Sequence, residues 1–368
     1  MKFIFWTSFT LVAYAYVGYA FLLLVWVRLR RHPLLQKSIT PTVSIIMAAH
    51  NEELRLPTKL ANVAALHYPK EQLQIIVASD GSTDQTVEIL RANREVVPVI
   101  LPQARGKACA LNQAVAFATG EILVFLDVRQ TVEPNAVSEL VSCFTDPGVG
   151  AVSGELLLEA AADGPSPEAL GIYWKIEKMV RRLESETGSV VGVTGAIYAL
   201  RRELYVEIPA GTILDDVFVP MNVARRGKRV VFQSSAIARD RIFSEPGKEF
   251  SRKARTLTGN YQLLRIAPWL LSPQNPLLFR FISHKLMRLV VPLLLVMMLL
   301  TSATTPAPLY RSIFAVQLVF YGLAAIGMLF PRSKRAKPIA IASTFVMLNA
   351  AAAVAFSNFI MGREKVWV

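Results

Sequence analysis

Four long windows without a charged side chain constrain this sequence more than any other feature. One lies near the N-terminus and three lie near the C-terminus: 3–27, 289–310, 312–330 and 338–362. A helix over the first window would be roughly 37 Å long at about 1.5 Å per residue, enough for a hydrocarbon core of about 30 Å. The sequence therefore predicts a transmembrane anchor at 1–30 and three transmembrane helices at 289–362, with a domain of another kind between them.

Composition narrows the class of protein further. Of 368 residues, 53% are hydrophobic and 18% are charged, which excludes a disordered chain. Two cysteines exclude a disulfide scaffold, so we expect Cys109 and Cys143 to be buried free thiols. The net charge of +13 suits an anionic membrane face or a phosphate-bearing ligand. The basic residues gather beside the apolar windows and no nucleic-acid motif is present, so we expect no nucleic-acid partner.

The basic residues also predict an orientation, because lysine and arginine concentrate on the cytoplasmic side of membrane spans. They follow the first window and flank the other three on one common side: Arg28, Arg30, Arg31, Lys37, Arg280, Lys285, Arg288, Arg332, Lys334, Arg335 and Lys337. We therefore expect a protein of the cell (inner) membrane whose central domain is cytoplasmic and whose two ends face outward. Segment 261–288 contains Pro268, Trp269 and Pro273 and is predicted to form interfacial helices at the membrane surface.

The central domain alternates between short β-rich runs and helix-length patterns. The predicted strands are bounded by polar or turn residues and cover Val43–Ala49, Gln74–Ser79, Val97–Leu101 and Ile122–Leu126. Helical patterns lie between them, at 52–66, 83–94 and 107–118. This alternation predicts an α/β fold with a mostly parallel sheet. Glu52, Asp80 and Asp127 follow the strands, at the edge where such sheets bind ligands.

Five motifs in this order resemble those of glycosyltransferase family 2 with the GT-A fold. They occur at the first strand, after the second strand, at a helix start, after the fourth strand and near residue 215: Val43–Glu53, Ala78–Asp84, Gly106–Asn112, Leu123–Asp127 and Leu214–Asp216. With the flanking apolar windows, the chain resembles membrane-embedded polysaccharide synthases, such as those of poly-N-acetylglucosamine, hyaluronan and cellulose. The resemblance covers about residues 40–260 and implies a nucleotide-diphospho-sugar transferase domain, Rossmann-like in its α/β order, between transmembrane helices.

The resemblance implies a reaction and a set of site residues. The chain would be an inverting enzyme that transfers a sugar from a nucleotide sugar, most simply a UDP-sugar, to a glycan or lipid-linked acceptor. Asp216 would be the general base, with Asp215 beside it, and Asp127 would bind a divalent cation, Mg²⁺ or Mn²⁺. The remaining candidates would bind substrate: Glu52, Asp80, Lys107, Asn112, Arg129, Arg252 and Arg255.

Two departures from the family pattern change these expectations. The metal-binding Asp-x-Asp motif is Asp127-Val128-Arg129 here, so an arginine stands in place of the second carboxylate. We expect a weakly bound cation, with Arg129 able to grip a phosphate instead. The Gln-x-x-Arg-Trp motif of processive synthases is only echoed by 252–256, which places repeated addition of sugars in question.

Each candidate also has a simpler structural explanation. Asp80 and Asp127 could be turn residues, Lys107 a solvated lysine, and Glu52 a first-turn acid. Asp215 and Asp216 could be a helix cap, and Arg252 and Arg255 a basic face near the anionic leaflet. Two alternative functions follow from the same sequence. The chain could be a non-catalytic membrane partner of a polysaccharide synthase, or it could transfer sugar to a lipid phosphate.

Overall fold

A computed structural model describes residues 1–159, 168–241, 246–330, 332–333 and 336–363. Within these residues the strands form one mixed sheet in the order β3-β2-β1-β4-β7-β6-β8-β5. The strands are β1 (Val43–Ala49), β2 (Leu73–Asp80), β3 (Val96–Leu101), β4 (Ile122–Leu126), β5 (Thr131–Val132), β6 (Val149–Glu159), β7 (Ile197–Arg201) and β8 (Arg229–Arg241). Strands β1 to β4 are parallel, as the sequence predicts, whereas β7 runs antiparallel to both β4 and β6.

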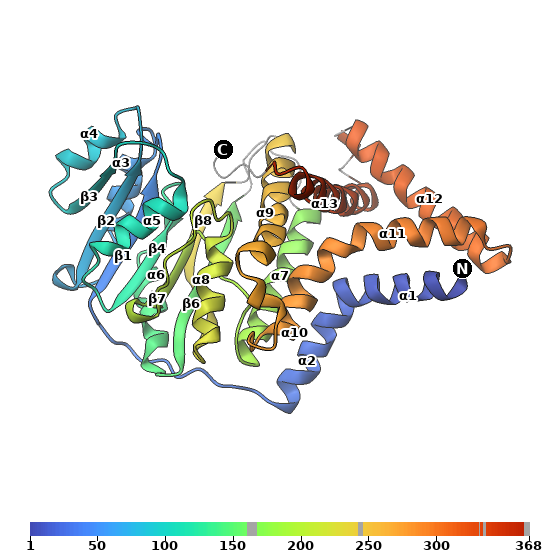
Figure 1. Cartoon of the computed structure of the whole chain (residues 1–368), viewed down its shortest axis with the longest axis horizontal. Coiled ribbons are helices and arrows are strands. Elements are labelled where there is room, and N and C mark those ends of the chain that lie inside the picture. The colour runs from blue at the N-terminus through green and yellow to red at the C-terminus, as the bar shows by residue number, and fades with distance from the viewer. Residues whose placement is uncertain (160–167, 242–245, 331, 334–335, 364–368) are drawn as a thin grey trace.

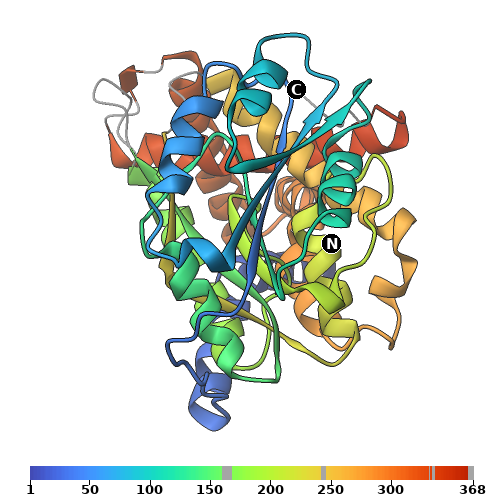
Figure 2. The same ribbon diagram turned by 90° about the vertical axis from the view of Figure 1, so that its left-hand side faces the viewer.

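Helices cover both faces of the sheet (Figures 1 and 2). The longer helices of the domain are α3 (Leu56–Ala64), α4 (Thr86–Ala92), α5 (Lys107–Ala116), α6 (Ala136–Ser142), α7 (Glu168–Glu186), α8 (Asp215–Arg225) and α9 (Pro246–Ile266). Short 3-10 turns lie at Lys70–Gln72, Cys143–Thr145, Arg202–Leu204 and Pro268–Leu271.

Successive residues of a strand point to opposite faces, and this alternation builds two cores. Ile45 and Met47 pack with α3 and α6 in one core, while Ile46 packs with α5 and α8 in the other. All three side chains are fully buried. Cys109 and Cys143 are buried free thiols, so that prediction is confirmed.

The apolar helices lie at one end of the molecule. Near the N-terminus, α1 (Lys2–Ala13) continues through the π-turn η1 (Tyr14–Gly18) into α2 (Tyr19–Leu29). Near the C-terminus, α10 (Leu278–Phe281) continues through the π-turn η6 (Ile282–Leu286) into α11 (Met287–Thr304). Two further helices follow, α12 (Pro308–Leu329) and α13 (Lys337–Ile360). Four continuous helices in the described residues are long and apolar enough to cross a membrane: Lys2–Leu29, Leu278–Thr304, Pro308–Leu329 and Lys337–Ile360. Figure 1 shows α1, α11 and α12 extending away from the sheet.

Helix α13 has a different direction from its neighbours. Figure 1 shows it end-on, whereas α1 and α11 run across the same view. Its first turns pack on Gly327 of α12, and Phe356 and Phe359 near its end stack around Tyr261 of α9. The end of α13 therefore lies against the sheet domain. The expectation that its C-terminal end faces outward stays a prediction, because these contacts place α13 beside α9 and do not locate the membrane.

Candidate functional site

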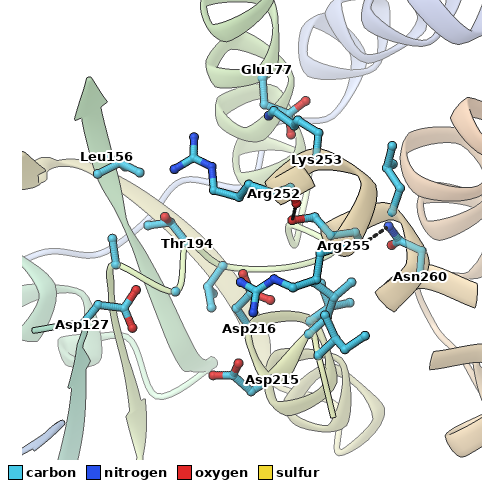
Figure 3. Close-up of a pocket in the computed structure, with 18 of the residues that line it drawn as sticks. Asp127, Leu156, Glu177, Thr194, Asp215, Asp216, Arg252, Lys253, Arg255 and Asn260 are labelled. Carbon is cyan, nitrogen blue, oxygen red and sulfur yellow. Dashed lines mark hydrogen bonds between the residues drawn. The ribbon is translucent and has the colours of Figure 1, made fainter. Parts of the chain in front are cut away.

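A cavity of about 590 Å³ lies where the carboxyl ends of β1 and β4 meet helices α7, α8 and α9 and the apolar helices. Eight of the candidates from the sequence line it: Glu52, Lys107, Asp127, Arg129, Asp215, Asp216, Arg252 and Arg255. Figure 3 shows Asp127 on one side of the cavity and the Asp215–Asp216 pair on another, with the two arginines reaching in from α9. Asp80 and Asn112 are not part of this lining.

Asp80 ends β2 and holds the loop that precedes α5. Its side chain is buried, and its two carboxylate oxygens accept hydrogen bonds from the backbone N–H groups of Arg105 (2.7 Å) and Gly106 (2.8 Å). The turn itself requires Gly81, which has a φ of 61°, because a Cβ there would lie 2.2 Å from the backbone nitrogen of Ala104. Asp80 thus supports the loop that leads into Lys107, the first residue of α5.

Asn112 occupies a similar supporting position one turn further along α5. Its side chain donates to the carbonyl of Ile208 (2.8 Å) and accepts from the Ile208 N–H (2.9 Å) and the Tyr205 hydroxyl (2.6 Å). All of these partners belong to the segment that follows β7. Asn112 therefore joins α5 to the segment that leads toward α8. That Asn112 also contacts the substrate stays a prediction.

Lys107 links the two acidic parts of the cavity. Its Nζ lies 3.0 Å from Oδ1 of Asp127 and 3.5 Å from Oδ2 of Asp215. Burial by itself would lower the pKa of the Lys107 ammonium, but the carboxylates of Asp127, Asp215 and Asp216 outweigh it and raise that pKa above its ordinary value. Lys107 therefore carries a fixed positive charge at the start of a helix, where an anionic ligand is further stabilised by the free N–H groups.

Asp215 and Asp216 form the first turn of α8. The backbone carbonyl of Asp216 accepts a hydrogen bond from Val193 (2.8 Å), which joins α8 to the loop before β7. Burial, together with the neighbouring Asp215 carboxylate, raises the pKa of Asp216 to about 6, against the lowering effect of Lys285, Lys107 and Arg181. Oδ1 of Asp216 is buried without a hydrogen-bond partner among the described residues. A carboxylate in this state is suited to accept a proton near neutral pH.

Arg129 lines the cavity while its guanidinium pairs with Asp240 of β8. The same Asp240 oxygen accepts a hydrogen bond from Gln130 (3.1 Å), so both residues after Asp127-Val128 are tied to β8. The backbone carbonyl of Gln130 also accepts a hydrogen bond from the buried Lys59 ammonium (2.7 Å). Burial lowers the pKa of Lys59 to about 8, although Asp127 opposes the shift. The Asp127 turn is therefore surrounded by positive charge.

Glu52 lines the cavity beside Arg55, whose guanidinium lies 3.1 Å from its carboxylate. Gly195 and Thr194 also line it, and a Cβ at Gly195 would lie 3.6 Å from Asp216 and 3.8 Å from Lys107. The structure has residues 193–196 at the cavity as a loop and begins β7 at Ile197.

Sequence reasoning missed the part of the cavity that adjoins the apolar helices. This part contains Glu177 and Arg181 from α7 and His284, Lys285 and Arg288 from the helix that enters α11. Both ring nitrogens of His284 lie 3.0 Å from a carboxylate, one of Glu177 and one of Glu184. No short motif marks these residues, and only the spacing of Glu177 and Arg181 on one helix face gives a local signal.

Comparison with known proteins defines the class to which this fold and site belong. Residues 44–208 match the profile of the family described as "Glycosyl transferase family 2". The whole chain is similar in fold to a solved structure titled "Mannosyltransferase PcManGT from Pyrobaculum calidifontis in complex with GDP-Man and Mn2+", with a TM-score of 0.74 and 21% identity over 98% of this chain and 100% of that one. The chain therefore matches the profile of this family over somewhat less than half of its length and has the GT-A fold.

Two curated relatives are similar to part of this chain. The chain is 25% identical to the "Poly-beta-1,6-N-acetyl-D-glucosamine synthase" of Staphylococcus aureus over 229 residues, which are 60% of this chain and 55% of the relative. It is 29% identical to the "Probable glycosyltransferase YdaM" of Bacillus subtilis over 213 residues, 54% of this chain and 50% of the relative. The chain thus matches about half the length of each relative.

Proposed function

We propose that the chain is an inverting membrane glycosyltransferase that transfers a sugar from a nucleotide sugar, most simply a UDP-sugar, to a hydroxyl of a glycan or lipid-linked acceptor. One observation carries the proposal. A single cavity contains a cation suited to the donor's diphosphate, Lys107, and a carboxylate with raised proton affinity, Asp216. The family 2 profile over 44–208, which includes Lys107 and ends shortly before Asp216, supports the same reaction class.

In the proposed reaction, Asp216 takes the proton of the acceptor hydroxyl while the hydroxyl oxygen attacks the anomeric carbon of the donor sugar. The bond from that carbon to the diphosphate oxygen breaks, and the nucleoside diphosphate leaves with the electron pair. Attack from the side opposite the leaving group inverts the configuration at the anomeric carbon. Lys107 at the head of α5, with Arg252 and Arg255 from α9, stabilises the negative charge that develops on the diphosphate.

The residues at Asp127 fit a divalent cation only together with the donor. Among the described residues, no three His, Cys, Asp or Glu side chains come together as a metal site. Asp127 is a third exposed and would be one protein ligand, with phosphate oxygens of the donor as further ligands, a combination that Mg²⁺ accepts. Such an ion would offset charge on the diphosphate. Arg129, paired with Asp240, provides no second carboxylate.

The proposal is tested by a panel of radiolabelled nucleotide sugars on the purified full chain in lipid nanodiscs, with product sizing. We include UDP-sugars, and also GDP-mannose because the solved neighbour contains it. Transfer from one donor, with release of the matching nucleoside diphosphate, is the expected result. A folded chain that binds nucleotide sugars but releases nothing would favour the alternative of a non-catalytic partner of a synthase. The close approach of Lys107 to Asp127 and Asp215 favours a catalytic chain over a non-catalytic partner.

The side of the membrane on which the domain lies is also a proposal. The basic clusters beside the apolar helices support a cytoplasmic domain at 40–260, an anchor at 1–30 and a membrane-surface segment at 261–288. For 289–362, the contacts of α13 with Tyr261 favour two crossings, by α11 and α12, with α13 along the membrane surface. Reporter fusions at both ends test this arrangement. The two-crossing arrangement places the C-terminus inside, whereas three crossings would place it outside.

A further inference from the structure

Two π-turns lie side by side where the apolar helices meet the cavity. The turn η1 contains Tyr14 and Tyr16, and the turn η6 contains Ser283, His284 and Lys285. The hydroxyls of Tyr14 and Ser283 are 2.7 Å apart, so the turns are in direct contact. A π-turn inserts an extra residue into a helix and redirects the side chains around it, and such turns occur frequently at functional sites. Here they direct Tyr16, His284 and Lys285 to the cavity wall.

The charges at this end of the cavity are unbalanced. Three cations, Arg181, Lys285 and Arg288, line it together with the carboxylate of Glu177, and the carboxylate of Asp216 lies within electrostatic reach of Arg181 and Lys285. Glu177 is already shared, at 3.5 Å from Arg181, 2.7 Å from Arg288 and 3.0 Å from His284. Lys285 has no hydrogen bond or ion pair with any described residue, although it is largely enclosed. An excess of enclosed positive charge is stabilised by an anionic ligand.

The wall beside these cations is apolar and belongs to helices with membrane-spanning length. Leu348 and Ala352 of α13 line the cavity there, next to Asn349, whose amide donates to the Tyr16 hydroxyl (3.0 Å). A ligand at this place would meet positive charge on one side and hydrocarbon on the other. That combination matches an anionic headgroup joined to a lipid chain.

We propose that Lys285, Arg181 and Arg288 bind the phosphate or diphosphate through which a membrane-anchored acceptor is joined to its lipid, with the lipid chain along α13. The inference rests on the proposed function and names its acceptor class. The donor's own diphosphate is assigned to Lys107, whose partners are Asp127 and Asp215 rather than Glu177. Asp216 lies close enough to both ends that Lys107, Lys285 and Arg181 all influence its proton affinity.

The position of Asp216 also selects the atom that attacks. A base is needed when the attacking group is a hydroxyl, whereas a lipid phosphate monoester is already largely ionised at neutral pH and would attack without one. The acceptor that uses both parts of the cavity therefore carries a sugar hydroxyl at Asp216 and its linking phosphate at Lys285. A lipid-diphosphate sugar has this arrangement, and the lipid phosphate itself is the rival acceptor.

The test measures equilibrium binding of radiolabelled farnesyl diphosphate to the full chain in phosphatidylcholine nanodiscs. Saturating UDP keeps the probe away from the donor end. Farnesol and inorganic diphosphate serve as competitors that carry only the lipid or only the anion. We expect farnesyl diphosphate to bind with saturation, and neither competitor to displace it at equal concentration. Displacement by inorganic diphosphate alone would show a site for a free anion, and displacement by farnesol alone would show a lipid site without anion recognition; either result overturns the proposal.

Substitutions of the cationic side chains test whether they bind farnesyl diphosphate. Lys285→Gln should weaken farnesyl diphosphate binding about tenfold, the cost of one charge-assisted hydrogen bond, and Lys285→Arg should restore most of it. Arg181→Gln provides a second variant on a different helix. The matched control is Arg182→Gln, because Arg182 is the next residue of α7, 70% exposed and paired with Glu186. Equal binding by wild type, Lys285→Gln and Arg181→Gln overturns the inference.

UDP binding separates this inference from the proposed function. Variants that bind UDP like wild type but lose farnesyl diphosphate support the acceptor site. A wild-type chain that binds UDP and transfers sugar to an acceptor without a lipid phosphate refutes the acceptor site and leaves the glycosyltransferase intact. A wild-type chain that binds no nucleotide at all refutes the proposed function itself.

Discussion

The two ends of the cavity are built in different ways. The donor end is formed by Lys107 at the start of α5, Asp127 directly after β4 and Asp215 at the start of α8, while Asp80 supports the loop before Lys107. The membrane-side end combines residues from Tyr16 to Ala352, contributed by the first apolar helix, α7, the entry to α11 and α13. In the proposed assignment, binding of the donor depends on the strand ends and helix starts of the sheet domain, whereas binding of the acceptor depends on how distant helices pack.

The largest expected effect comes from Asp216, which lies between the two ends. Asp216→Asn keeps the size of the side chain but cannot accept a proton, and loss of a general base typically lowers the rate about 10²–10⁴-fold. The measurement is sugar transfer with UDP binding determined alongside. UDP affinity should stay within about twofold of wild type, because the donor contacts are assigned to other residues.

Asp215→Asn is the comparison variant for this prediction. Asp215 is the neighbouring residue on α8, and its carboxylate lies 3.5 Å from the Lys107 ammonium. Near-wild-type transfer by a folded Asp216→Asn chain would remove Asp216 from the mechanism. In that case a large loss in Asp215→Asn would identify the neighbour as the base.

The second prediction concerns Asp80, at the donor end. Asp80→Ala removes the acceptor of the Arg105 and Gly106 N–H groups and frees the loop before Lys107. Leaving buried donors unpaired costs about 1–3 kcal/mol each, so we expect UDP binding to weaken by about tenfold to a hundredfold. Farnesyl diphosphate binding at the membrane-side end should not change. Equal weakening of both ligands would show that the two ends do not behave as separate sites.

The donor end could be predicted from sequence because its chemistry is local. Strands β1 and β4 occupy the residues that the short β-rich runs between polar or turn residues predict, and Lys107 does begin a helix. The membrane-side end could not be predicted, because Lys285 and Arg181 belong to segments about a hundred residues apart and no repeat or motif links them. The same limit applies to Asn112, whose partners Tyr205 and Ile208 are distant in sequence, and to the antiparallel insertion of β7.

The third prediction uses the pKa of Asp216, which is raised to about 6. The base must be ionised, so transfer should rise with pH through about 6, fall about tenfold per unit below it, and level off above it. The folded state binds the Asp216 proton more tightly than the unfolded state does. The protonated carboxyl therefore contributes to the free energy of unfolding in full at low pH, and this contribution is lost as pH rises through about 6. Asp216→Asn should therefore melt at a higher temperature than wild type at pH 8, with the difference shrinking at pH 4. A flat rate profile between pH 5 and 7 contradicts the assignment.

The smallest expected effect concerns Arg129, which replaces a carboxylate of the family's metal motif at the donor end. Arg129→Asp removes a positive charge near Asp127 and adds an oxygen ligand, so Mn²⁺ affinity measured with UDP present should rise about threefold to tenfold, on the order of 1 kcal/mol. The new carboxylate will also repel Asp240, which loses its guanidinium partner, so a thermal melt and the milder Arg129→Gln variant accompany the measurement.

Without UDP we expect little Mn²⁺ binding by the wild-type chain, since Asp127 is then the sole carboxylate of the motif. Tight binding of Mn²⁺ without nucleotide, unchanged in Arg129→Asp, would show that the cation is held elsewhere and that the donor end is not organised around Asp127.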